Sequence, residues 1–65
     1  MNTIKFNDLH GDEHIVNPAH ITELHTGYKG DNFGNRIGYR YYVDIVGRTN
    51  IEVDQLVYKD IVAQL

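Results

Sequence analysis

The strongest constraint on the fold is an alternating stretch, YRYYVDIV, at residues 39–46. Aromatic and β-branched residues favour strands, and side chains in a strand point alternately to its two faces. The pattern therefore predicts a strand with one face packed inward. The inward face would carry Tyr39, Tyr41, Val43 and Ile45. The opposite face would carry Arg40, Tyr42 and Asp44.

Four shorter segments have the same character. Ile4 and Phe6 alternate with polar residues, which indicates a half-buried strand. A Gly-Asp turn at 11–12 leads into a second apolar strand at 15–16, and Pro18 ends it because proline has no N–H. Residues 21–28 read as a third strand with Ile21 pointing inward, and a GRTN turn precedes a last strand at 51–53.

The chain ends in a predicted helix. Asp54 is a suitable N-cap, because its carboxylate can accept hydrogen bonds from the free N–H groups of the first turn. Val57, Ile61 and Leu65 are spaced four apart, with Tyr58 and Val62 beside them. The fold class is therefore α+β and mainly β. We expect a single domain over residues 1–65, a small barrel or roll of five strands with a C-terminal helix.

Taken in order, these features resemble the small FlbD-like proteins of flagellar gene clusters. The resemblance covers most of the chain outside residues 28–38 and implies an SH3-like five-stranded barrel or roll. It implies no catalytic residue. The positions that carry it are Ile4, Asn7, Gly11, Glu13, Ile15, Asn17, Ile21, Val46, Gly47, Val53, Val57 and Ile61.

Small size limits how the chain can be stabilised. A domain of 65 residues buries only about 60% of its unfolded surface. There is no cysteine, so disulfides and thiolate metal sites are excluded. A well-packed single core and a homo-oligomer both stay open. The N-terminus lacks a signal-peptide pattern, and no apolar run approaches the roughly 18 residues of a membrane span. We expect a soluble, cytoplasmic protein without a membrane partner.

Catalysis finds little support in the composition. The chain has neither serine nor cysteine, and none of its threonines has an identifiable base beside it. A barrel of this size also offers little volume for a pocket. We expect a non-enzymatic protein that needs no cofactor.

Histidines give one alternative function, metal binding. His10 and His14 have a spacing that zinc sites use on helices, and His20 and His25 follow. The residues between His10 and His14 form a turn instead, so we interpret these two as ordinary exposed side chains beside it. No metal ligands are assigned.

The segment 27–42, GYKGDNFGNRIGYRYY, differs from the rest of the chain. It contains four glycines, five aromatic residues and three of the six basic residues. Three cations against one acid give it a charge of +2, whereas three cations against eight acids give the remainder −5. Gly30, Gly34 and Gly38 permit positive φ, so we expect residues 28–38 to form a loop or hairpin tip.

Aromatic rings beside cations are typical of contact surfaces. Tyrosine and arginine are enriched at protein–protein hot spots, and the same residues stack on bases and meet phosphates in single-stranded nucleic-acid binders. A charge of only +2 favours a protein partner, because few phosphate contacts give weak binding. The predicted function is an interaction protein of the kind found among bacterial regulators and phage inhibitors, with single-stranded nucleic-acid binding as the alternative. The predicted partner-binding residues are Tyr28, Lys29, Phe33, Arg36, Arg40 and Tyr42.

Overall fold

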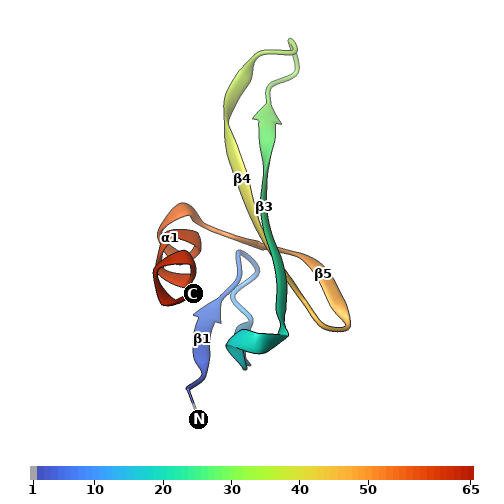
Figure 1. The fold of residues 1–65 in the computed structure, drawn as a ribbon. Helices are drawn as coiled ribbons and strands as arrows, with labels where there is room; N and C mark the ends of the chain where they lie inside the picture. Colours follow the sequence, from blue (N-terminus) through green and yellow to red (C-terminus); the bar gives the residue numbers. More distant parts are fainter. Residues whose placement is uncertain (1) are drawn as a thin grey trace.

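The computed structural model describes residues 2–65, which form five strands and a C-terminal α-helix (Figure 1). The fold class, α+β and mainly β, is confirmed. No helix within these residues is long and apolar enough to cross a membrane. The elements are β1 (Ile4–Asn7), β2 (Glu13–Val16), a short 3-10 helix η1 (Pro18–His20), β3 (Ile21–Gly30), β4 (Arg36–Ile45), β5 (Arg48–Val53) and α1 (Gln55–Gln64).

The strands form two antiparallel sheets. β1 pairs with β2, and β4 lies between β3 and β5 in the other sheet. Within residues 2–65 the two sheets are not joined into a closed barrel. The hairpin of β3 and β4 extends well beyond the other elements (Figure 1), which gives the molecule its extents of 47 × 22 × 20 Å.

Both sheets and the helix contribute to one hydrophobic core. In β1 the predicted alternation is confirmed, because Ile4 and Phe6 are buried and their polar neighbours are exposed. Burial of this kind stabilises the fold by roughly 1.5–3 kcal/mol for each large apolar side chain. The buried apolar residues are Ile4, Phe6, Val43, Ile51, Val53 and Ile61.

The chain leaves the second sheet at Val53. This residue pairs with Tyr41 of β4, and the next residue, Asp54, caps α1 by accepting a hydrogen bond from the Val57 N–H at 2.8 Å. The predicted N-cap is therefore confirmed. Its position turns the chain so that Ile61 enters the core, whereas Leu65 is 62% exposed. The apolar stripe of the helix is shorter than predicted because α1 ends at the surface.

The inward face of β4 is also shorter than predicted. Val43 is fully buried and Tyr41 packs against the core, with its ring 5.0 Å from that of Tyr58. Tyr39 was expected beside them but is 57% exposed. The reason is that β5 ends opposite Tyr41, so β4 continues without a neighbouring strand on that side.

The predicted loop at residues 28–38 is mostly strand. β3 runs to Gly30 and β4 begins at Arg36, so the loop is limited to residues 31–35. Cross-strand pairs such as Tyr28 with Tyr39 extend the ladder through the glycines. Of the glycines in segment 27–42, only Gly34 has a positive φ, at +81°.

The packing of α1 predicts that substitutions at two helix positions will have very different effects on the free energy of unfolding. Ile61 has no exposed surface, whereas Leu56 on the same helix is 79% exposed. Ile61→Ala should lower the free energy of unfolding by about 2–5 kcal/mol, because it opens a cavity in the core. Leu56→Ala should change it by less than about 0.5 kcal/mol. Urea denaturation of both variants checks this, and equal effects would contradict the described core.

Candidate binding surface on the β3–β4 arm

The part of the β3–β4 hairpin beyond the Tyr41–Val53 pair is called the arm, residues 27–40. Its two strands pair with each other through Gly27–Arg40, Tyr28–Tyr39 and Lys29–Gly38. None of the six buried apolar residues of the core lies in the arm. Because no side chain of the arm belongs to that core, the arm side chains are available for another role, such as binding.

The tip of the arm is ordered by one carboxylate. Asp31 accepts hydrogen bonds from the backbone N–H groups of Phe33 at 2.8 Å and Asn35 at 2.9 Å. The Asp31 N–H donates in turn to the Asn35 carbonyl at 2.9 Å, and Gly34 supplies the left-handed residue. The hydrogen bonds from Asn35 and Phe33 hold the pKa of Asp31 below its usual value. The loop is therefore a defined turn that presents Phe33 at its end.

Two predicted contact residues, Tyr28 and Arg36, lie together on the arm with a third residue, Tyr39, that was assigned to the core. The rings of Tyr28 and Tyr39 are 5.3 Å apart, and each tyrosine is 57% exposed. The Arg36 guanidinium lies 3.9 Å from the centre of the Tyr28 ring, a cation–π contact. Phe33, at the tip, is 89% exposed.

Ile37 is a surface residue that sequence reasoning missed. It is 60% exposed on the arm. Its signal was available, because an isoleucine between Arg and Gly in a polar segment has no core to enter. Contiguous exposed apolar groups commonly mark interaction sites in soluble proteins.

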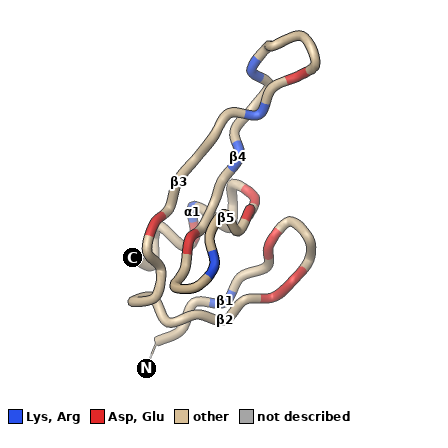
Figure 2. The backbone as a smooth tube through the Cα atoms, turned by 90° about the vertical axis from the view of Figure 1, so that its right-hand side faces the viewer, with Lys and Arg blue, Asp and Glu red and all other residues tan. Residues whose placement is uncertain are grey.

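Lys29 lies farther along the arm and lines the hollow described below. The other two predicted residues lie at the base of the arm or just below it. Arg40 lies 3.8 Å from Glu52 of β5, a partly exposed ion pair that contributes little to stability. Tyr42 is half-buried, and its ring stacks on that of His25 at 5.0 Å. The structure thus separates Tyr42 from the exposed cluster. Figure 2 shows cations on the arm and several acidic residues around the body.

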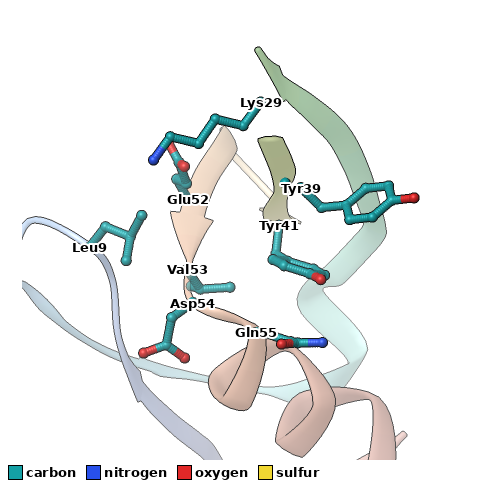
Figure 3. A pocket seen from close by; sticks show the side chains of 9 residues that line it. Leu9, Lys29, Tyr39, Tyr41, Glu52, Val53, Asp54 and Gln55 are labelled. Carbon is teal, nitrogen blue, oxygen red and sulfur yellow. The ribbon is translucent and has the colours of Figure 1, made fainter. Parts of the chain in front are cut away.

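A surface hollow lies where β5 leaves the sheet. Its volume is about 480 Å³, and apolar side chains of Leu9, Tyr41 and Val53 contribute to its walls. Lys29 and Glu52 also line it (Figure 3). This hollow corrects the expectation that so small a domain offers little volume for a pocket. It opens between the arm and the body because β5 stops short of the end of β4.

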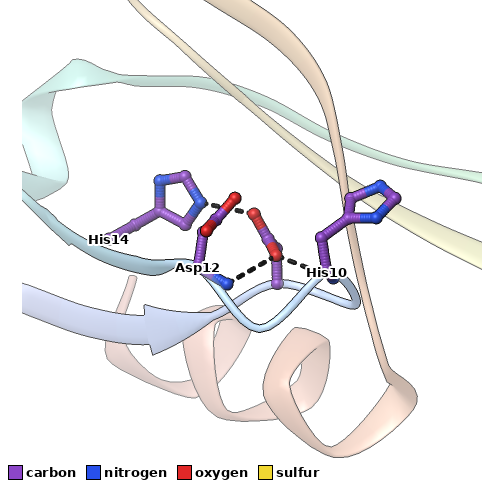
Figure 4. A network of polar contacts seen from close by, with 4 residues as sticks. His10, Asp12 and His14 are labelled. Carbon is purple, nitrogen blue, oxygen red and sulfur yellow. Dashed lines mark hydrogen bonds and ion pairs between the residues drawn. The ribbon is translucent and has the colours of Figure 1, made fainter.

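Two of the histidines form buried or half-buried pairs with aspartates. The His14 ring Nε2 lies 2.8 Å from Asp8 Oδ2, and the ring stacks on Phe6 at 5.0 Å. Asp8 also accepts hydrogen bonds from the backbone N–H groups of His10 and Asp12 (Figure 4). His14 was expected to be exposed, and its side chain is only 10% exposed. The stacking on Phe6 across the β1–β2 pair explains this burial.

The second pair lies at a bulge between β4 and β5. Asp44 Oδ1 accepts a hydrogen bond from the Asn50 N–H at 2.7 Å and lies 3.0 Å from His25 Nε2. Asn50 adopts a left-handed φ of 58°, which asparagine tolerates better than most residues. This carboxylate connects all three strands of the sheet. The contacts with Asn50 and His25 hold the pKa of Asp44 below its usual value, and those with His14, Asp12 and His10 do the same for Asp8.

Two of the four histidines, His14 and His25, therefore belong to separate structural pairs. Within residues 2–65 there is no group of three His, Cys, Asp or Glu side chains that could hold a metal ion. His10 and His14 do not converge, because the ring of His14 turns toward Asp8 (Figure 4).

Comparisons with known protein families, curated protein sequences and solved structures find no match for this chain. The resemblance to FlbD-like proteins therefore stays an expectation from the sequence.

The two Asp–His pairs predict that stability falls in acid. Because folding lowers the pKa of Asp8 and Asp44, their contribution is fully present above the ordinary aspartate pKa of about 3.8. It is lost as the pH falls through the lower folded-state values. Thermal unfolding followed from pH 7 to pH 2 should show the Tm declining below about pH 4.

Two variants test the cause of this decline. Asp8→Asn should have a lower Tm at pH 7 and a shallower acid decline. The control is Asp12→Asn, because the exposed Asp12 carboxylate makes no hydrogen bond or ion pair in the described part of the chain. An identical pH profile for Asp8→Asn and the unmodified protein would contradict the assignment.

Proposed function

We propose that this chain is a small non-enzymatic interaction protein that docks a protein partner through segment 27–42. The observation that carries the proposal is the arm itself, a two-stranded extension that exposes aromatic and basic residues and adds none of its side chains to the buried core. Bacterial regulators and phage-encoded inhibitors include proteins of this kind. We further propose that the protein is cytoplasmic and that its five strands form an SH3-like roll.

Composition of the arm supports a protein partner. Tyr39 and Arg36 both contact Tyr28, so the three residues form a preorganised cluster that loses little conformational freedom on binding. Phe33 and Ile37 add exposed apolar area. Such a surface matches the aromatic and arginine anchors that dominate protein interfaces.

Charge supports an acidic partner surface. Segment 27–42 carries +2 and the rest of the chain −5. A cationic arm on an acidic body would orient an approaching anionic surface toward the arm. The acidic body of a second copy is one such surface, so self-association is compatible with the proposal.

Single-stranded nucleic acid is the second candidate for the same arm. The observation that favours it is the contact of the Arg36 guanidinium with the Tyr28 ring, because rings and cations of this kind also bind bases and phosphates. Three cations give few phosphate contacts, so we rank this candidate below a protein partner.

Capture from a bacterial lysate tests the proposal. Tagged protein is compared with the triple variant Phe33→Ala, Arg36→Ala, Arg40→Ala, and bound material is identified by mass spectrometry and by absorbance at 260 nm. We expect a specific protein whose recovery falls at least about tenfold with the triple variant. Recovery of nuclease-sensitive nucleic acid instead would favour the second candidate.

The matched control carries the same kinds of change away from the arm. Leu56→Ala, Arg48→Ala and Lys59→Ala remove one exposed apolar residue and two cations from β5 and α1. This control should capture the partner as well as the unmodified protein does. Equal loss in both triple variants would show that the arm has no special role and would overturn the proposal.

A further inference from the structure

The arm has an open strand edge. β5 pairs with β4 only from Tyr41 to Ile45, and within residues 2–65 no strand pairs with the same side of β4 from Arg36 to Arg40. In an antiparallel strand, alternate residues direct both their N–H and their C=O groups to the same side. The backbone of residues 36–40 therefore offers donors and acceptors that an additional strand could pair with.

The hollow lies beside this edge. Tyr39 and Gly38 of the open segment line it together with Val53, the residue at which β5 ends. In Figure 3 the labelled side chains of Tyr41, Val53 and Leu9 surround the space below Lys29. A strand placed along β4 would direct alternate side chains to each face of the sheet. One of these side chains would lie over the hollow, whose volume of about 480 Å³ accommodates a large apolar group.

The charges near the edge specify the added strand. Lys29 and Arg36 have no carboxylate within 4.0 Å among the residues that the structure describes, and the ion pair of Arg40 is long and partly exposed. Glu52 and Asp54 also line the hollow, but Glu52 faces Arg40 and Asp54 caps α1. Two cations without a carboxylate partner beside an open edge therefore favour an acidic segment. Pairing with β4 of a second copy is disfavoured, because it would place the cations of two arms against each other.

We propose that the β4 edge at Arg36–Arg40 accepts an extended acidic peptide segment of a partner protein as an added strand, with one large apolar side chain in the adjacent hollow. Main-chain hydrogen bonds to β4 supply affinity, and the hollow and the cations supply specificity. This inference rests on the proposed function and specifies how the partner docks.

A random peptide library tests it without a known partner. Phage displaying random 12-residue peptides are selected on the unmodified protein. We expect the enriched peptides to be acidic and to contain an aromatic or large aliphatic residue. An enriched peptide is then synthesised and added to ¹⁵N-labelled protein, where it should protect amides within residues 36–40 from hydrogen exchange. Enrichment of neutral or basic peptides, or the absence of enrichment, would overturn the inference.

Backbone methylation separates strand addition from side-chain docking. The same peptide with alternate amides N-methylated, in each of the two registers, keeps its side chains but loses the donors that an added strand needs. We expect one of the two methylated peptides to bind roughly tenfold more weakly or worse, because main-chain hydrogen bonds carry affinity in this mode. Unchanged binding of both would overturn strand addition. The proposed function would still stand in that case if the variant Phe33→Ala, Arg36→Ala, Arg40→Ala failed to capture the partner protein from the lysate.

Charge reversal tests the role of the cations. Arg36→Glu should weaken the acidic peptide at least about tenfold, and the control Arg48→Glu, at the far end of β5 from the hollow, should not. Equal effects of the two reversals would overturn the proposed contact. The proposal would also be overturned if the bound peptide protected amides along the outer edge of β3 from hydrogen exchange and left those of residues 36–40 unprotected.

Discussion

The pairing of Tyr41 with Val53 is the constraint on which the arrangement of this molecule depends. It is the last pair between β4 and β5, and it divides the long hairpin into two parts with different surroundings. Below it, Val43, Ile51 and Val53 pack with Ile61 and the β1 side chains in the core. Above it, β3 and β4 continue as an arm without a third strand beside them. The place where β5 stops therefore creates the arm, the open edge of β4 and the hollow together.

Aspartates fix the places where the chain changes direction. Asp54 caps α1 directly after Val53, Asp31 organises the tip of the arm, and Asp44 holds the bulge between β4 and β5. Asp8 performs the same task in the turn between β1 and β2. A chain of this length buries few apolar residues, and carboxylates that accept backbone N–H groups satisfy turns that would otherwise be unpaired. Asp8, Asp44 and Asp54 of the acidic body are in this respect structural, and the arm is the cationic part of the molecule.

Sequence reasoning recovered the parts that depend on local pattern. The strand at Ile4–Asn7, the break at Pro18 and the N-cap at Asp54 each follow from a few neighbouring residues, and the structure contains them. The exposure of Tyr39 could not be predicted, because it depends on where a different strand ends. The burial of His14 could not be predicted either, since it requires Phe6 across the sheet and the carboxylate of Asp8. For the candidate site, sequence reasoning named Tyr28, Phe33 and Arg36, which the structure leaves exposed on the arm. It did not name the exposed Ile37, and it assigned Tyr39 to the core.

The central claim is that the arm serves binding and the body folds without it. The most direct measurement is urea denaturation of a protein in which residues 28–39 are replaced by Asn-Gly, the residues that favour a two-residue turn between Gly27 and Arg40. A two-stranded ribbon is marginally stable on its own, so the free energy of unfolding should stay within about 1 kcal/mol of the unmodified value. The transition should also stay cooperative. Loss of cooperative unfolding in the shortened protein would contradict the account, because the arm would then be part of what holds the body together.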